Sequence, residues 1–359
     1  MTGRGQRTDA SDLRSIAIVK LSALGDIVHV LPVAAALRAR WADARLAWVV
    51  ERPHAAILRR HPAIDEVVTV DTRAWRRARR PSDVARALRD VAAVRRRLRL
   101  IRPAVALDLQ GLLKSGIVTR ATGAPLRIGF GAARCKEPLA ARFTNRHVVP
   151  PASARHVVDQ YLALLEPLGL ERPAKPEFHL PWDDGAESAI EAFFAQAGLV
   201  ARDRLVVLNP GAARPDKRWP ASEFASLARL LVRRARARVL VLWGPGEDAV
   251  ARTIAGDARD VIMAPPTDLD ELLSVLRRAS VVVAADTGPL HLAAALGVPC
   301  AALFGPTSSE RNGPYGEGHR RFQSADGRIE TIPVESVLAG VADLLDVRTA
   351  TGSGPESDR

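Results

Sequence analysis

The stretch SIAIVKLSALGDIVHVLPVAAALRAR, residues 15–40, decides the fold of the first half of the chain. Its first six residues form a short apolar run, which predicts a buried strand. A loop that contains Gly25 follows, and residues 27–40 are expected to form one helix, because Pro32 falls near its first turns. A strand, a glycine-containing loop and a helix in this order predict the start of a β-α-β unit.

The same alternation continues along the chain and restarts after a proline-containing segment at residues 166–184, which we interpret as a linker. The first half predicts further strands at 46–50, 67–70 and 105–109, a long Arg-rich helix at 82–100 and a helix after residue 114. The second half predicts strands at 205–208, 239–242, 261–263, 281–285 and 300–303, with helices such as 221–234 and 268–279.

This rhythm predicts the α/β class, in which parallel sheets are covered by helices on both faces. We expect two Rossmann-like domains, at residues 13–175 and 176–348, and disordered ends at 1–12 and 349–359. The hydrophobic content of 47% over 359 residues is enough for each half to bury its own core.

The composition indicates which molecules this protein can bind and where in the cell it is expected. A net charge of +12 favours polyanions, such as nucleic acid, an anionic membrane surface or a phosphorylated substrate. The two cysteines lie far apart in the sequence, which fits a reducing compartment and no metal site. No apolar stretch is long enough to span a bilayer, and the first 14 residues lack the apolar part of a secretory signal, so we expect a cytoplasmic protein.

Ligands of open parallel sheets bind beyond the carboxyl ends of the strands, so the polar loops after strands are candidate sites. Asp26 follows the first strand and stands at the expected helix start, where the helix dipole favours an ionised carboxylate. Such a carboxylate can take a proton from a hydroxyl group. The alternative is an aspartate that only caps the helix.

Three loops of the second half predict a nucleotide-binding site. The loop at residues 209–220 is rich in Gly and Pro, and Lys217 can place its charge on a diphosphate. The loop Asp286-Thr-Gly-Pro-Leu-His291 precedes a helix whose free amides favour an anion. Glu247, after the strand at 239–242, can accept two ribose hydroxyls or can be a plain first-turn helix carboxylate.

A basic set in the first half predicts a substrate with several negative charges. It comprises Arg73, Arg76, Arg77, Lys114, Arg134 and Lys136. The runs at 79–80 and 95–99 are instead interpreted as solvated helix faces. Asp268-Leu-Asp270 matches a metal-binding pattern of some sugar transferases, but helix capping is the better interpretation, and no metal or cofactor is predicted.

Together these motifs resemble glycosyltransferase family 9, and within it the lipopolysaccharide heptosyltransferase I subfamily. The resemblance runs from about residue 15 to about residue 347. It rests on residues 20–32, 108–115, 137–138, 216–220, 243–244, 286–291 and 315–316.

The resemblance implies a GT-B fold of two facing Rossmann-like domains. It implies an inverting, metal-independent transfer of heptose from ADP-heptose to a Kdo residue of the lipopolysaccharide inner core on lipid A. Asp26 would be the base and Lys217 would bind the diphosphate. Implied donor contacts are Gly211, Ala212, Ala213, Lys217, Glu247, Asp286, Thr287, Gly288 and His291. Implied acceptor contacts are Ser22, Gly25, Arg73, Arg76, Arg77, Gln110, Lys114 and Lys136.

The expected location is the cytoplasmic face of the inner membrane of a Gram-negative-type bacterium, with a peripheral contact to anionic lipid and no nucleic-acid partner. Four positions depart from the family pattern. Ala212 and Ala213 replace two threonines of close relatives, so the hydroxyl contacts to phosphate must be replaced by backbone amides or lost. Gln160 and Lys136 stand where a basic residue and an arginine are expected.

Three alternatives remain open at this point. One is another family 9 transferase, which acts on a later core heptose or another surface glycan. A sugar-nucleotide epimerase of the same fold is the second. The third is a basic nucleic-acid-binding protein, which predicts aromatic stacking platforms that a content of 4% aromatic residues does not favour.

Overall fold

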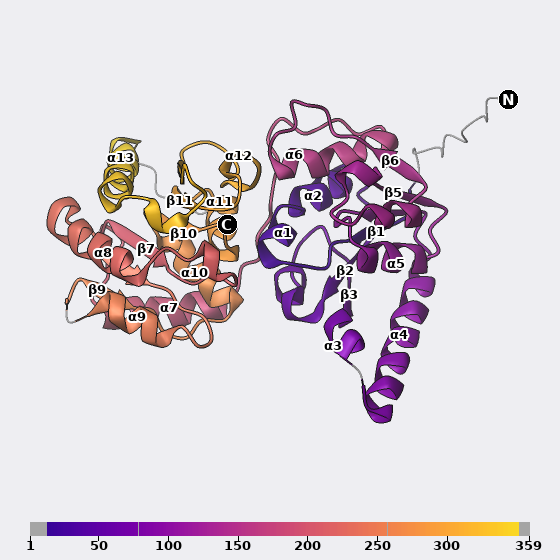
Figure 1. Cartoon of the computed structure of the whole chain (residues 1–359), viewed down its shortest axis with the longest axis horizontal. Helices are drawn as coiled ribbons and strands as arrows, with labels where there is room; N and C mark the ends of the chain where they lie inside the picture. Colours follow the sequence, from indigo (N-terminus) through magenta and orange to yellow (C-terminus); the bar gives the residue numbers. More distant parts are fainter. Residues whose placement is uncertain (1–12, 78, 257, 352–359) are drawn as a thin grey trace. The chain divides into compact units, whose positions relative to one another are not determined.

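The structure is a computed structural model that describes residues 13–77, 79–256 and 258–351. These residues divide into two compact units, one up to Pro181 and one from Trp182 (Figure 1). The division falls within the proline-containing segment 166–184. Of the expected disordered ends, residues 349–351 continue the last helix, and residues 1–12 and 352–359 lie outside the described part of the chain.

The first unit contains a six-stranded parallel sheet in the order β3-β2-β1-β4-β5-β6. Its strands are β1 Ser15–Val19, β2 Arg45–Glu51, β3 Glu66–Val70, β4 Val105–Asp108, β5 Leu126–Phe130 and β6 Arg146–Val148. The helices are α1 Leu24–Val28, α2 Leu31–Arg40, α3 Thr72–Arg77, α4 Pro81–Ile101, α5 Leu113–Ala121 and α6 Val157–Leu162. Short 3₁₀ helices are η2 Arg52–Leu58, η3 Ala132–Arg134, η4 Pro138–Phe143 and η5 Ala163–Leu168.

The second unit contains a second parallel sheet in the order β12-β11-β10-β7-β8-β9. Its strands are β7 Leu205–Asn209, β8 Arg238–Val241, β9 Val261–Met263, β10 Val281–Ala285, β11 Cys300–Phe304 and β12 Arg320–Gln323. The helices are α7 Asp184–Gln196, α8 Ala221–Ala235, α9 Asp248–Ala255, α10 Leu269–Arg278, α11 Gly288–Ala295, α12 Ser309–Asn312 and α13 Val334–Thr351. Two 3₁₀ helices are η6 Pro215–Lys217 and η7 Ile329–Thr331.

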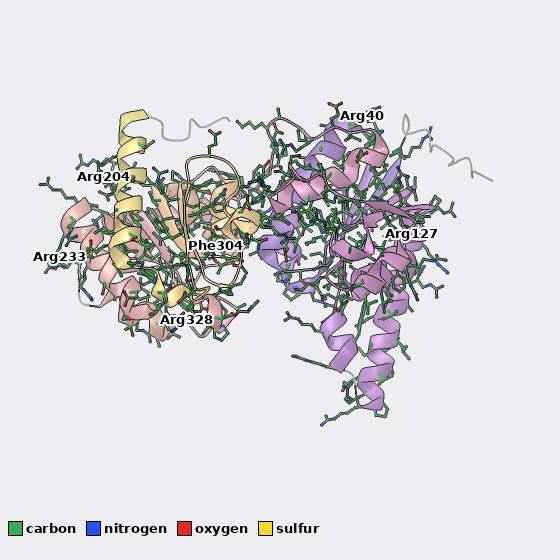
Figure 2. All side chains as sticks on the ribbon, turned by 45° about the horizontal axis from the view of Figure 1, so that its top comes forward. Arg40, Arg127, Arg204, Arg233, Phe304 and Arg328 are labelled. Atoms are coloured by element: carbon green, nitrogen blue, oxygen red, sulfur yellow. The ribbon has the colours of Figure 1, made fainter. Side chains whose placement is uncertain are left out.

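The predicted fold class is confirmed, because both sheets are parallel and their central strands are buried along their length. Strands covered on both faces need apolar residues at every position, which is why the central strands stand out as apolar runs. Figure 2 shows Arg40, Arg233 and Arg328 extending outward from the ribbon, whereas Phe304 of β11 is fully buried. Three strands that we did not predict, β5, β6 and β12, carry arginine side chains and lack such a run.

The single helix expected at 27–40 is wrong. The structure has α1 and α2 instead, with Val30 as the N-cap of α2 and Pro32 in its first turn. Proline has no backbone N–H, so it cannot donate to the carbonyl of residue 28 and a continuous helix is interrupted. Asp26 therefore lies in the first turn of a short helix, not before a long one.

The strand order of each sheet reverses once. It reverses between β1 and β4 in the first unit, and between β7 and β10 in the second. At such a point the loops that follow the two neighbouring strands turn to opposite sides and leave a crevice at the carboxyl edge of the sheet. Each unit therefore has one place where its topology favours a ligand.

Candidate active site

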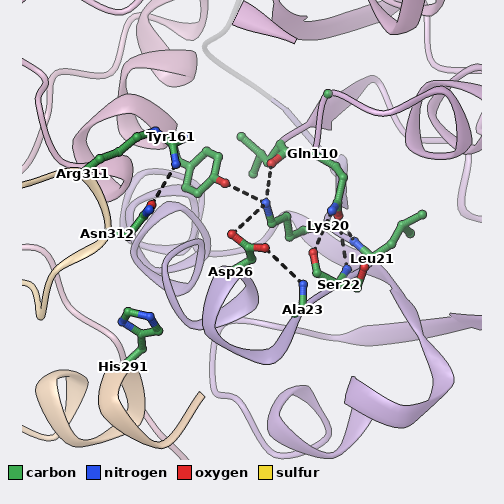
Figure 3. A network of polar contacts seen from close by, with 12 residues as sticks. Lys20, Leu21, Ser22, Ala23, Asp26, Gln110, Tyr161, His291, Arg311 and Asn312 are labelled. Atoms are coloured by element: carbon green, nitrogen blue, oxygen red, sulfur yellow. Dashed lines mark hydrogen bonds and ion pairs between the residues drawn. The ribbon is translucent and has the colours of Figure 1, made fainter. Parts of the chain in front are cut away.

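The reversal point of the first unit is built around a buried lysine. Lys20 directly follows β1 and is 2% exposed. Its Nζ donates to the Tyr161 hydroxyl at 2.7 Å and to the Leu109 carbonyl at 3.0 Å, and lies 3.9 Å from Oδ1 of Asp26 (Figure 3). Burial disfavours the charge of Lys20, but Tyr161, Asp26 and Asp108 outweigh it and raise the pKa of the ammonium above its usual value.

Asp26 is the candidate base of this site. Its side chain is 46% exposed, so a substrate can reach the carboxylate. The Oδ2 atom accepts a hydrogen bond from the Ala23 N–H at 3.2 Å, which ties the carboxylate to the start of α1 (Figure 3). Helix capping and proton transfer, which we treated as alternatives, are thus compatible, because Oδ1 faces Lys20 while Oδ2 caps the helix.

Gln110 holds the loop that carries these groups. Its Oε1 accepts from the Leu21 N–H at 2.8 Å and from the Ser22 N–H at 3.2 Å, and its Nε2 donates to the Ser22 carbonyl at 2.7 Å. The side chain follows β4, so these bonds cross the reversal point and link the loops after β1 and β4. Gln110 therefore positions the loop that we predicted to contact the acceptor.

Lys114 belongs to a charged cluster beside this loop. Its Nζ lies 3.2 Å from Oε1 of the buried Glu51 and 3.5 Å from the Ser22 hydroxyl. Glu51 also accepts from the Thr72 N–H at 3.2 Å. Burial, followed by the charges of Arg73 and Lys114, holds the pKa of His54 below its usual value, so Arg73 acts on the same cluster.

The other predicted acceptor residues are more scattered. Arg77 lines the groove between α3 and α4 together with Asp83 and Asp90. The exposed Lys136 precedes Glu137, whose carboxylate accepts from the Leu113 N–H at the start of α5. The side chain of Arg76 lies outside the part of the chain that the structure describes. The structure thus brings Ser22, Gly25, Asp26, Gln110 and Lys114 to one loop cluster of the first unit.

The reversal point of the second unit holds a lysine, an aspartate and a histidine in contact. Asp286 follows β10, and its Oδ2 accepts from Nζ of Lys217 at 2.6 Å. Its Oδ1 lies 3.0 Å from Nε2 of the buried His291 in α11. Burial opposes ionisation of Asp286, but the hydrogen bonds and charges of His291 and Lys217 outweigh it, so the pKa of this carboxyl lies well below its usual value.

Asn209 joins the two loops at this point. It ends β7, and its Nδ2 donates to the Gly211 carbonyl at 3.1 Å and to the Thr287 hydroxyl at 3.2 Å. Thr287 is the N-cap of α11, and Gly288 is the first residue of this helix. The first N–H groups of a helix have no acceptor within the helix, so this end of α11 presents donors to an anion.

Glu247 lies against Gly211. Its Oε2 accepts from the Gly244 N–H at 2.9 Å, and a Cβ atom on Gly211 would lie 2.1 Å from that oxygen. The carboxylate therefore occupies the space that a side chain at residue 211 would take. Ala212 is buried and its carbonyl accepts from Nε of Arg218 at 2.8 Å, whereas Ala213 is exposed.

The described residues contain no group of three His, Cys, Asp or Glu side chains that could hold a metal ion. The expected role of Asp268 is confirmed, because its Oδ1 accepts from the Glu271 N–H at 2.9 Å and caps α10. Within the same described part of the chain, no helix has the length and apolar character needed to cross a bilayer.

The sequence did not identify Lys20, Tyr161 and Asn209 as site residues. A signal existed for Lys20, because it is one of five lysines in a chain with 52 basic residues and it directly follows a strand. No local signal marks Tyr161, because it lies 141 residues away from its partner. Asn209 was included in the loop motif, but its side chain had no assigned role.

Comparison with known proteins shows which family this chain is similar to. The model of glycosyltransferase family 9 (heptosyltransferase) matches residues 91–335. Lipopolysaccharide heptosyltransferase 1 of Salmonella typhimurium strain LT2 is 30% identical over 330 residues, which cover 91% of this chain and 99% of the relative. The solved structure of Escherichia coli heptosyltransferase WaaC with ADP superposes with a TM-score of 0.76 at 27% identity, covering 92% of this chain and 99% of the other.

A second structure of WaaC, with ADP-2-deoxy-2-fluoro heptose, has a TM-score of 0.72 at 27% identity and covers 94% of this chain and 100% of the other. The family match spans well over half of the chain, and it includes the loops that hold Lys217, Glu247 and Asp286. The chain is therefore an enzyme that belongs to glycosyltransferase family 9.

Proposed function

We propose that this enzyme transfers heptose from ADP-heptose to a Kdo residue of the lipopolysaccharide inner core on lipid A. The proposal is supported by the named activity of the Salmonella relative and by the ADP and ADP-heptose analogue in the WaaC structures. The observation that carries it is the half-exposed Asp26 carboxylate at a sheet reversal point, with the Lys20 ammonium 3.9 Å away.

The chemistry of the proposed reaction is an inverting displacement. Asp26 takes the proton of the acceptor hydroxyl while the hydroxyl oxygen attacks the anomeric carbon of the heptose. The bond between that carbon and the diphosphate breaks, ADP leaves with the electron pair, and the configuration of the carbon inverts. The Lys20 ammonium lies 3.9 Å from Oδ1 of the carboxylate that takes this proton.

The second unit is proposed to hold the donor and stabilise the departing ADP without a metal. An ammonium has three N–H donors, so Lys217 can keep one on Asp286 and turn others to a phosphate oxygen. The first amides of α11, at Gly288 and beyond, add fixed donors for the same charge. Glu247, placed next to Gly211, is proposed to accept the ribose hydroxyls.

The first unit is proposed to hold the acceptor, with Lys114, Arg73 and Lys136 facing its anionic groups. Phosphates and the Kdo carboxylate give this acceptor several negative charges, which matches a basic surface. The proposed location is the cytoplasmic face of the inner membrane, with peripheral contact to anionic lipid, because the acceptor is anchored there by its acyl chains.

The test is ADP release from ADP-heptose with and without Kdo-lipid A. We expect release only when both are present, a heptosylated product by mass spectrometry, and unchanged rates in EDTA. Release with UDP- or GDP-sugars in place of ADP-heptose would indicate another family 9 donor. Conversion of the donor without acceptor would indicate an epimerase, and loss of activity in EDTA would contradict the metal-independent mechanism.

A further inference from the structure

The helix α4 exposes apolar side chains along most of its length. Figure 1 shows α3 and the first turns of α4 extending beyond the sheet of the first unit. Only Leu98 and Ile101, near the end of α4, are buried in the core, whereas Leu88 is 65% and Leu100 is 67% exposed. A contiguous group of exposed apolar side chains marks an interaction surface, whereas single scattered ones need no explanation.

The periodicity of α4 shows which face is uncovered. Asp83, Ala87, Asp90 and Val94 recur at helical spacing and are half-buried, and the first three line the groove toward α3. Val84, Leu88 and Val91 recur at the same spacing on the neighbouring face, where they are exposed. A side chain at 88 is therefore not needed to hold α3 against α4.

This uncovered face combines apolar and basic groups. A groove of about 490 Å³ runs along it, with Leu88, Val91, Ala92 and Leu100 as apolar lining and Arg95, Arg96, Arg99 and Arg102 as basic lining. None of the described residues that line the groove is acidic. We name these eight residues, with Val84, the α4 face.

Arg97, which lies in the arginine run 95–99 of α4, has a different role. Arg97 forms an ion pair with Glu66, so it attaches α4 to the edge of the sheet. We interpreted the run 95–99 as a solvated helix face, and its four arginines are indeed exposed. Arg97 has a structural partner in addition, and Arg95, Arg96 and Arg99 line the groove beside the apolar side chains.

We propose that the α4 face docks on a bilayer surface that contains anionic phospholipid. Guanidinium groups bind phosphate oxygens of lipid headgroups, while leucine and valine side chains insert at the boundary between headgroups and acyl chains. Nucleic acid is disfavoured as the partner, because the centre of the face is aliphatic and offers no aromatic ring for base stacking. The proposal rests on the proposed function, in which the acceptor is a membrane lipid, and it assigns the docking surface.

The test is cosedimentation of the full-length protein with vesicles of phosphatidylcholine alone or mixed with phosphatidylglycerol. We expect binding to the mixed vesicles only. The double variants Leu88→Ser with Leu100→Ser, and Arg95→Glu with Arg99→Glu, should each bind at least about tenfold more weakly. Each changes exposed side chains, so folding should be retained, which circular dichroism checks.

Two matched controls address nonspecific effects. Val149→Ser removes an apolar side chain of the first unit that is 70% exposed, and Arg233→Glu reverses an exposed charge on α8 (Figure 2). Both should bind the mixed vesicles as the wild type does. Equal losses of vesicle binding in the controls and the α4 variants would overturn the proposal. Wild-type protein that does not bind the anionic vesicles would overturn it too. Duplex DNA binding that depends on the same arginines, or retained binding in the leucine variant, would overturn it as well.

The failure of this proposal can be distinguished from failure of the proposed function. With a soluble, deacylated Kdo acceptor, the α4 variants should release ADP at the wild-type rate, because no residue of the α4 face belongs to the candidate active site. With Kdo-lipid A in vesicles their rate should fall. Vesicle binding is measured by cosedimentation without turnover, so this result can be interpreted even if the enzyme uses other sugar substrates.

Discussion

Replacing Asp26 by asparagine removes the proposed base while it keeps most contacts of the side chain. An asparagine oxygen can still accept from the Ala23 N–H, which lies 3.2 Å from the present carboxylate. The ion pair with Lys20 is lost, but its atoms are 3.9 Å apart and the Asp26 side chain is 46% exposed, so water already screens it. The change therefore separates chemistry from folding.

The two effects differ greatly in size. Loss of a general base lowers turnover by about 10²- to 10⁴-fold, which is about 3–5 kcal/mol in the activation barrier. The free energy of unfolding should change by about 1 kcal/mol or less, because the pair is long, the carboxylate is half-exposed, and the buried Lys20 ammonium keeps its hydrogen bonds to Tyr161 and Leu109. Affinity for ADP should stay the same, because the proposed nucleotide site lies in the other unit.

Asp65→Asn is the matched control. Its side chain is also 46% exposed, but its Oδ2 accepts from Arg38 at 2.6 Å and from the Leu46 N–H at 2.7 Å. Hydrogen bonds to a charged group contribute about 1.5–3 kcal/mol each, so this variant should lose about 1–3 kcal/mol of stability. Turnover should be unchanged, because Asp65 lies before β3 and away from the reversal point.

The assays are steady-state ADP release, titration calorimetry with ADP, and urea unfolding of both variants and the wild type. The expected outcome is a crossed pattern, in which one variant loses activity and the other loses stability. An Asp26→Asn enzyme with near-normal turnover would refute the role of Asp26 as base. Equal losses of turnover in both variants would show that the measurement reports general damage.

Three further predictions follow from the contacts of single residues. Tyr161→Phe removes one of the two acceptors within 3.0 Å of the buried Lys20 ammonium, so urea unfolding should show a loss of about 1–3 kcal/mol, and an unchanged value would contradict this bond. Gly211→Ala should weaken ADP binding in calorimetry, because the new Cβ would displace the Glu247 carboxylate, whereas Gly131→Ala, with open space around its Cβ, should bind ADP normally. Burial of His61 outweighs its hydrogen bond to the Phe178 carbonyl and lowers the pKa of His61 to about 4. The unfolded chain therefore binds a proton at His61 below about pH 6.5, whereas the folded state binds it only near pH 4. The unfolding free energy should therefore fall as pH drops from about 6.5 to 4, and it should fall less in His61→Gln; parallel pH curves would disprove the assignment.

Much of the architecture follows from the sequence, because strands covered on both faces require continuous apolar runs. The central strands β1, β4, β7 and β10 satisfy this requirement, and it makes them visible without a structure. The loops after them then become candidate sites, since ligands of parallel sheets bind at that edge. Asp26, Lys217 and Asp286 were all located by this reasoning.

Two of the four edge strands and the proline-interrupted helix were harder to predict. The edge strands β6 and β12 are short, half-exposed and rich in arginine, so their pairing depends on a neighbouring strand and not on an apolar run of their own. The chain before Pro32 forms a separate short helix, because Pro32 has no N–H to donate to the carbonyl of residue 28.

The sequence by itself determined the strand-end loops and the kinds of charge they carry, because those follow from local pattern. Only the tertiary structure decided which charges meet. Tyr161 reaches Lys20 across 141 residues, and Lys217 reaches Asp286 across 69. Such pairs form because the sheet brings distant loops to one edge, where burial makes each charge depend on its partner. The sequence likewise showed an arginine run in α4, but the packing of α3 and the sheet decided that Arg97 is paired and that Leu88 is left uncovered.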